Sequence, residues 1–332
     1  MKVNCRLLKS IIAAVVMVFM AGVVVGCAGG AGGKQSKGGM PQRLTIGASE
    51  PGSSWYPMAA AMKEVLEKEF PGTKVDIFYG GGDINLKALE EKKIDFGITF
   101  GVTAADAKAG KGRFEKPLQN ISSAMGLYLA ALQMVVRPDS GINSISDLKG
   151  KKISTGMPGY ATTGIFEQIL PLYGLKKEDV KWVSGTASDI AGMFKDRTID
   201  FCAVHSTIRV PFPMIQDIAS QTPITLLGID DQIMEQLREM NPGHQKVVIP
   251  ANLYRGLSKE VTTEGTVGML ATRADLSEEV VYNVVSALIK NADYLAKAVA
   301  DLSYISADKS SKGLGISLHP GAEKYYKEKG TL

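Results

Sequence analysis

Apolar residues along the chain recur at two spacings, one typical of strands and one typical of helices. Leu44–Ala48 is a short apolar run, and Trp55–Phe70 then carries apolar side chains at helical spacing. Val75–Tyr79 and Phe96–Phe100 predict two more strands, with a helix over Asp83–Lys93 between them. Strands that alternate with helices in this way predict an α/β fold with parallel strands.

The same alternation returns further along the chain and predicts a second α/β unit. We expect its strands at Lys152–Gly156, Val180–Ser184 and Phe201–Val204. We expect its helices over Thr162–Tyr173 and Ala187–Arg197, and a long C-terminal helix over Glu278–Val299. A weak internal repeat supports two related units, because Lys93–Phe96 and Thr198–Phe201 have matching sequences where a helix gives way to a strand.

The N-terminus has the pattern of an export signal. Basic residues precede Ile11–Val25, an apolar run of small residues that is too short for a stable membrane span. The small residues before Cys27 resemble a bacterial lipobox, which implies cleavage before Cys27 and acylation of its sulfur; the alternative is an ordinary leader that happens to contain a cysteine. We therefore expect a signal peptide over 1–26 and a lipid-anchored flexible tether over 27–41, where Gly, Ala, Ser, Lys and Gln predominate.

Removal of the leader changes both the charge and the cysteine count. The whole chain has 38 basic and 34 acidic residues, and the leader carries three of the basic ones, so the mature chain has 35 basic residues and a net charge near +1. This balance argues against a nucleic-acid partner. Cys202 is then the one cysteine that is neither removed nor acylated, so stability has to come from burial of apolar surface. About 290 residues follow the tether, a length that favours two domains.

Sequence motifs of common enzyme classes are absent. The chain has no Gly-x-Ser-x-Gly elbow, no His-Glu-x-x-His and no phosphate-binding Gly-x4-Gly-Lys loop. The histidines His205, His244 and His319 lie far apart in the sequence. We therefore predict neither catalysis nor a metal site nor a cofactor.

Three junctions where a loop leads into a helix are rich in glycine and hydroxyl residues. They are Ser53–Tyr56, Gly80–Asn85 and Gly156–Gly164. Unpaired N–H groups at a helix N-terminus and the helix dipole attract anions, and small residues let a ligand approach. Each junction could instead be an ordinary helix cap. Three of them, spread over both α/β units, favour a binding cleft.

Longer motifs around these junctions resemble one family of receptors. They are Gly47–Pro57, Gly81–Leu86, Val135–Ile142, Ile145–Lys151, Val248–Leu257, Leu270–Leu276 and Leu318–Tyr326. In this order, between Leu44 and Leu332, they resemble the TAXI-type solute receptors of tripartite ATP-independent periplasmic (TRAP) transporters.

The resemblance implies a type 2 periplasmic-binding-protein fold, with two α/β lobes joined by a two-segment hinge. We expect one lobe to comprise 42–136 plus 266–332 and the other 137–265, with the crossings near Arg137 and Gly265. The resemblance implies a periplasmic or other extracytoplasmic monomer, anchored to the membrane by its lipid. It would capture a small carboxylate such as glutamate, glutamine or 2-oxoglutarate and deliver it to the membrane permease subunits.

The expected ligand-binding residues come partly from the resemblance and partly from their chemistry. The sequence departs from the family's usual pattern at Trp55, Phe100 and Thr163, and its stretch Val204–Arg209 is two residues longer than the usual one. Arg209 could pair with a ligand carboxylate through its guanidinium, or lie solvated on a loop. His205 could donate to the ligand, or be a buried structural histidine. The expected set is Ser54, Trp55, Tyr56, Asn85, Thr99, Thr162, Thr163, His205 and Arg209.

Two other classes of function fit the same fold. One is an exported enzyme or a ligand-sensing domain that acts on a signalling partner. The other is a surface-exposed, immunogenic lipoprotein with no transport role. The hydroxyl-rich junctions favour a protein that binds a small solute over both alternatives.

Overall fold

The computed structural model describes residues 39–332, whose strands form one mixed sheet. The order of the central path is β2-β1-β3-β10-β4-β7-β5-β6, with β8 paired to β4 and β9 paired to β10. The strands are β1 Arg43–Ala48, β2 Lys74–Tyr79, β3 Phe96–Phe100, β4 Ile121–Val136, β5 Lys152–Ser154, β6 Lys181–Trp182, β7 Phe201–Thr207, β8 Thr225–Leu227, β9 Gln245–Ile249 and β10 Val261–Arg273.

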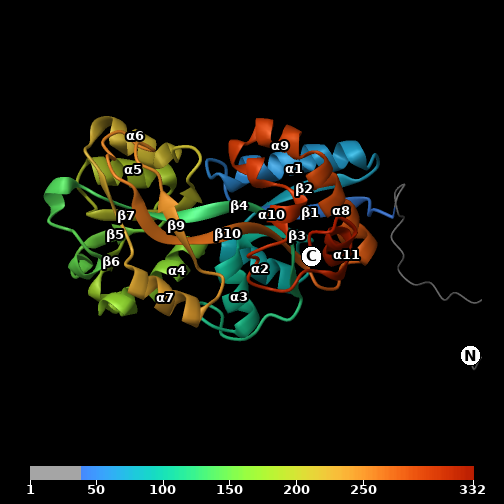
Figure 1. Ribbon diagram of the computed structural model, residues 1–332, viewed down its shortest axis with the longest axis horizontal. Coiled ribbons are helices and arrows are strands. Elements are labelled where there is room, and N and C mark those ends of the chain that lie inside the picture. The colour runs from blue at the N-terminus through green and yellow to red at the C-terminus, as the bar shows by residue number, and fades with distance from the viewer. Residues whose placement is uncertain (1–38) are drawn as a thin grey trace, which may run out of the picture. The chain divides into compact units, whose positions relative to one another are not determined.

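Helices cover the two ends of this sheet and define two lobes (Figure 1). The first lobe contains β1–β3 with α1 Trp55–Glu69, α2 Gly82–Glu90, α3 Gly101–Ala109, α8 Glu278–Lys290, α9 Ala292–Ala298, α10 Ala307–Ser310 and α11 Pro320–Glu328. The second lobe contains β5–β9 with α4 Ala161–Ile169, α5 Ala187–Lys195, α6 Pro213–Gln221 and α7 Asp231–Met240. Short 3-10 helices are η1 Pro138–Ser140, η2 Ile145–Leu148, η3 Leu170–Tyr173, η4 Lys177–Asp179 and η5 Ala300–Tyr304.

The long strands β4 and β10 connect the two lobes. They pair with each other in antiparallel fashion from Ile121 to Ala131 on β4. Beyond that point β4 pairs with β7, and β10 pairs with β9 up to Gly265. The lobe bounds expected from the sequence stay a prediction, but the change of strand partners falls near Ala130 and Gly265.

The structure differs from the expected elements most clearly in three places. The sheet is mixed, because β4 and β10 run antiparallel to their neighbours, while β1, β2 and β3 are parallel as expected. The strand expected over Val180–Ser184 is only Lys181–Trp182. The helix expected over Glu278–Val299 is interrupted at Asn291, whose φ of −102° and ψ of 23° end α8 before α9 begins.

The predicted signal peptide over 1–26, most of the tether over 27–41, and Cys27 lie outside the described residues. Acylation of Cys27 therefore stays a prediction. Within residues 39–332, the helices are all too short or too polar to span a membrane.

Cys202 lies in β7 with its side chain fully buried in the core of the second lobe. Burial raises the pKa of the Cys202 thiol to about 12, although the Arg137 charge opposes this shift. Because the thiolate is the reactive form, we expect Cys202 to resist an exchanging disulfide reagent in the folded protein. The number of reactive thiols should rise by one on unfolding in urea, and Cys202→Ala should abolish that rise. Reaction of Cys202 under native conditions would contradict this prediction.

Candidate ligand-binding site

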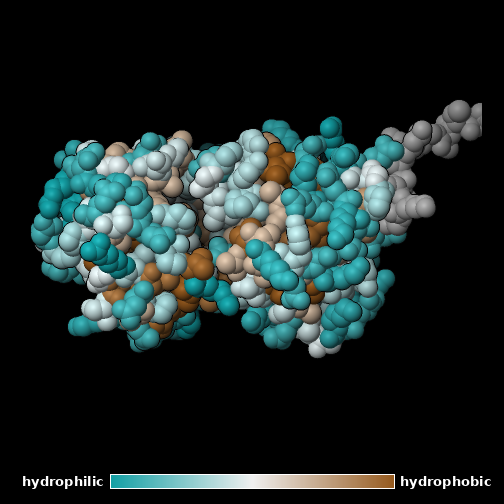
Figure 2. Space-filling model, turned by 90° about the horizontal axis from the view of Figure 1, so that it is seen from above, coloured by the Kyte–Doolittle hydropathy of each residue, from teal (hydrophilic) through white to brown (hydrophobic). Residues whose placement is uncertain are grey.

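A small cavity lies where the N-termini of α1, α2 and α4 meet between the lobes. Figure 2 shows a furrow between the two lobes on one face. The cavity has a volume of about 70 Å³, which is room for roughly five water molecules. It is lined by Ser49, Ser53, Ser54, Trp55, Gly81, Gly82, Phe100, Tyr160, Ala161, Thr162, Val204, His205 and Phe212.

The three helices that point at this cavity begin without a side-chain cap. No side-chain hydrogen bond caps α1, α2 or α4 within the described part of the chain, whereas Thr186 caps α5 and Ser277 caps α8. Gly81 precedes α2 with a φ of 135°, a backbone conformation that favours glycine. The free N–H groups of three helix ends therefore face one small space, which suits an anionic group.

Ser53 adds a hydroxyl group to this cavity. Its backbone N–H donates to the carbonyl of Glu50 at 3.1 Å, which fixes the turn before α1. Its side-chain oxygen is buried, and no residue in 39–332 hydrogen-bonds to it. A buried hydroxyl without a partner is costly, so a ligand that accepts its hydrogen bond would be stabilised.

Aromatic side chains form one wall of the cavity. The Trp55 indole donates a hydrogen bond to the Tyr128 hydroxyl at 2.7 Å, and the Trp55 ring packs edge-on against Phe100 at 5.2 Å between centroids. Phe100 also contacts the His205 ring, with centroids 5.2 Å apart. These contacts fix the indole and give the cavity a rigid apolar side.

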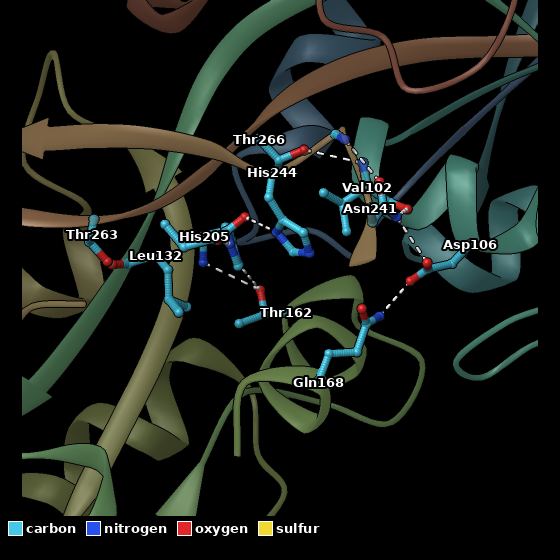
Figure 3. Close-up of polar contacts among 12 residues, drawn as sticks. Val102, Asp106, Leu132, Thr162, Gln168, His205, Asn241, His244, Thr263 and Thr266 are labelled. Atoms are coloured by element: carbon cyan, nitrogen blue, oxygen red, sulfur yellow. Dashed lines mark hydrogen bonds and ion pairs between the residues drawn. The ribbon is translucent and has the colours of Figure 1, made fainter. Parts of the chain in front are cut away.

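His205 belongs to a buried network centred on Glu264 of β10. The Glu264 carboxylate accepts hydrogen bonds from His205 Nε2 at 2.6 Å and from His244 Nδ1 at 2.8 Å, and all three side chains are inaccessible to solvent. Burial opposes ionisation of Glu264, but the charge and hydrogen bonds of the two histidines outweigh it and lower its pKa to about 2. The other ring nitrogen of His205 lies 3.4 Å from the Thr162 hydroxyl, and Figure 3 shows the two side chains pointing toward each other.

Polar side chains link the two lobes around the cavity. Asp106 of α3 accepts hydrogen bonds from Gln168 of α4 and, at 2.9 Å, from Asn241 after α7 (Figure 3). The Tyr160 hydroxyl donates to Glu50 of the first lobe. In this structure the lobes are therefore in contact through polar side chains.

A second ionisable pair lies beside the start of α2. Asp83 forms an ion pair with Arg113 at 2.8 Å, and Arg113 also donates to the Tyr160 carbonyl at 3.3 Å. Burial raises the pKa of Asp83 to about 6, although the Arg113 charge acts in the opposite direction. Arg113 thus ties the first lobe to the first turn of α4.

The structure brings some of the expected site residues together. The ones that line the cavity are Ser54, Trp55, Thr162 and His205. Two others lie behind it: the Asn85 amide donates to the carbonyls of Ala48 and Ile98 at 3.0 and 2.8 Å, and the Thr99 hydroxyl donates to the Gly82 carbonyl at 3.4 Å. These two side chains hold the loops that lead into α1 and α2.

The remaining expected residues lie away from this cavity. Tyr56 packs against Tyr79 with centroids 5.8 Å apart. Thr163 hydrogen-bonds to the Thr155 hydroxyl at 2.8 Å. Arg209 is exposed, and its backbone N–H donates to the Thr207 hydroxyl at 3.2 Å. Contact of these three residues with a ligand stays a prediction.

The sequence did not indicate a role for Glu264 or Phe212, and it indicated Ser53 only as part of the junction Ser53–Tyr56. Glu264 carried one usable signal, since it is an acid within the otherwise uncharged run Val261–Thr272. Phe212 is separated from the junctions by many residues and offers no such signal.

Comparisons with known proteins agree with this architecture. Residues 46–330 match the model of the NMT1-like family, and the chain therefore belongs to that family. A solved structure from Bordetella bronchiseptica RB50 is similar to this chain at 17% identity, with a TM-score of 0.50 and coverage of 87% of this chain and 81% of that one.

Two solved binding proteins are also similar. The alkanesulfonate-binding protein SsuA from Xanthomonas axonopodis pv. citri, bound to MOPS, is 16% identical, with a TM-score of 0.46 and coverage of 86% of this chain and 84% of that one. The amino acid ABC transporter substrate-binding protein AbpA from Streptococcus pneumoniae Canada MDR_19A, bound to L-arginine, is 14% identical, with a TM-score of 0.47 and coverage of 79% and 94%. The expected α/β fold, with two lobes joined by two strands, is confirmed by the sheet and helices of this structure and agrees with the similar fold of the Bordetella protein.

Proposed function

We propose that this protein is an extracytoplasmic solute-binding protein that captures a small carboxylate between its lobes and delivers it to a membrane permease. The observation that carries the proposal is the meeting of three uncapped helix N-termini at one small cavity. Helix ends of this kind bind anions through their N–H groups. No Lys or Arg side chain lines the cavity within residues 39–332, so the backbone and hydroxyl groups would supply the recognition.

The size of the cavity supports a small solute. A cavity of about 70 Å³ has room for a small solute and not for a large one. Trp55 and Phe100 would contact the apolar part of the solute, and Ser53 and Thr162 would bind its oxygen atoms. Closure of the lobes on the solute would remove it from water and add contacts from both sides.

The partner follows from the motifs between Leu44 and Leu332 that resemble TAXI receptors. On that basis the partner is a TRAP-type permease, and the protein is a monomer held outside the cytoplasmic membrane by a lipid on Cys27. A small acid would then pass from this receptor to the permease with no chemical change.

A thermal-shift screen tests the proposal, and Ser53→Ala is its sharpest variant. The panel contains glutamate, glutamine, 2-oxoglutarate, C4 dicarboxylates and uncharged compounds, added after any co-purified ligand has been removed by unfolding and refolding. A ligand at 100 times its Kd should stabilise the fold by about 2.7 kcal/mol, which is a rise of several degrees in Tm. Since the Ser53 hydroxyl has no partner in the described protein, Ser53→Ala should leave the ligand-free Tm unchanged and weaken acid binding about tenfold.

Ser258→Ala is the matched control, because Ser258 is exposed and does not line the cavity. It should bind the acid as the wild type does. If only neutral compounds raise Tm, the carboxylate class is wrong. If Ser53→Ala binds the acid with unchanged affinity, the acid does not occupy this cavity.

A further inference from the structure

A second and larger cavity lies on the other side of Ser53 and Ser54. Its volume is about 440 Å³, and it shares Ser53, Ser54 and Phe212 with the first cavity. Its walls come from the start of α1, from the segment after β7 and from η5. The full lining is Gly52, Ser53, Ser54, Pro57, Ala187, Ser206, Thr207, Val210, Pro211, Phe212, Pro213, Met214, Val299, Ala300 and Asp301.

Asp301 is the one charged side chain in this lining. It is 7% exposed, and no residue in 39–332 hydrogen-bonds to its Oδ1 atom. Burial raises the pKa of Asp301, while a hydrogen bond from Thr207 and the charge of Arg209 act in the opposite direction. A buried carboxylate with an unpaired oxygen is expensive, so this cavity favours a ligand that brings a positive charge.

Burial raises the pKa of Asp301 and the charge of Arg209 opposes this rise, but Arg209 does not occupy the unpaired oxygen of this carboxylate. No ion pair within 4.0 Å joins Arg209 to Asp301 in the part of the chain that the structure describes, and Arg209 is exposed. The guanidinium therefore acts on Asp301 only through its field. Oδ1 is left without a hydrogen-bond partner among the described residues, and the Asp301 side chain lines the cavity.

The two cavities thus differ in the charge that they favour. The first is lined by helix N-termini and hydroxyl groups, which suit a carboxylate, and the second presents the Asp301 carboxylate, which suits an ammonium group. Because they share Ser53, Ser54 and Phe212, one solute could reach both of them.

We propose that Asp301 binds the ammonium group of the solute, so that the protein selects amino acids over acids without an amino group. This inference rests on the proposed carboxylate site for the other end of the solute. It assigns a specificity role to η5, a segment of the first lobe, and to a cavity distinct from the one between the helix N-termini.

Titration calorimetry on the refolded full-length protein in detergent tests the proposal with three probes. Glutamate and glutarate differ only in the ammonium group, and butylamine has an ammonium group without a carboxylate. The wild type should bind glutamate at least tenfold more tightly than glutarate. Asp301→Asn should reduce this ratio to within about twofold, chiefly because glutamate binds more weakly.

Asp293→Asn is the matched control, since Asp293 is an exposed acid on α9, eight residues before Asp301. It should keep the wild-type ratio. The proposal is overturned if the wild type binds glutarate as tightly as glutamate, if Asp301→Asn keeps the preference, or if it weakens both acids equally. If butylamine bound to the wild type but not to Asp301→Asn, and neither acid bound, the ammonium site would stand and the proposed carboxylate function would be wrong. No binding of any probe overturns both.

Discussion

Glu264→Ala should lower the free energy of unfolding by about 3–5 kcal/mol, the largest effect that we expect of a single substitution in this protein. The carboxylate lies between two fully buried histidines and accepts a hydrogen bond from each of them. Its removal leaves two ring N–H groups in the interior without an acceptor. Urea unfolding at pH 7 measures the loss, and Tm should fall by roughly 10 °C.

The pH dependence of this effect separates it from a simple loss of packing. The pKa of Glu264 falls from an ordinary value of 4.5 to about 2 in the folded protein. The stability that its ionised form contributes is therefore fully present above about pH 4.5 and is lost as the pH falls toward 2. The difference in stability between the wild type and Glu264→Ala should shrink over the same interval.

Glu260→Ala provides the control, because Glu260 is an exposed acid just before β10. Its stability should lie within about 0.5 kcal/mol of the wild type. A loss below about 1 kcal/mol in Glu264→Ala would mean that His205 and His244 find other acceptors, and the network would then not be a main support of the hinge strands.

The alternation of short apolar runs with helical spacing was enough to predict the first lobe. The strands expected at Leu44–Ala48, Val75–Tyr79 and Phe96–Phe100 lie within one residue of β1, β2 and β3. This part was predictable because each strand is short and is followed at once by a helix with one apolar face. The same local pattern located the loop-to-helix junctions that line the cavity.

The two strands that connect the lobes were not predictable in this way. β4 runs for 16 residues and is buried on both faces almost throughout, so its sequence has no alternation of polar and apolar positions. β10 has the same character over 13 residues. Without these strands the sequence could not reveal that the sheet is continuous across the hinge.

The buried network was unpredictable for a different reason. His205, His244 and Glu264 come from β7, a loop and β10, and only the folded sheet brings their side chains together. His205 had two possible roles from the sequence, as a ligand donor or as a structural histidine. The structure gives it the Glu264 contact of a buried structural histidine and a place in the cavity wall, and donation to a ligand stays a prediction.

Gly82→Val should weaken solute binding about 100-fold, equivalent to about 3 kcal/mol. Since the new side chain also crowds Thr99 and Trp55 of the first lobe, the ligand-free fold should lose about 1–3 kcal/mol of stability. Gly82 is the first residue of α2, where a Cβ atom would lie 2.8 Å from the Ala161 Cβ atom of α4. The two helices belong to different lobes. A side chain at Gly82 would therefore keep the lobes apart and deprive the solute of contacts with the second lobe.

Gly192→Val is a matched control for this substitution. Gly192 also lies in a helix, but a Cβ atom there meets nothing within 4 Å. Calorimetry should show that Gly192→Val binds the best acid from the screen with wild-type affinity. This control separates the effect of the contact between Gly82 and Ala161 from the general effect of valine in a helix. If Gly82→Val bound that acid normally, capture would not require α2 and α4 to meet, and the solute would be held by the first lobe alone.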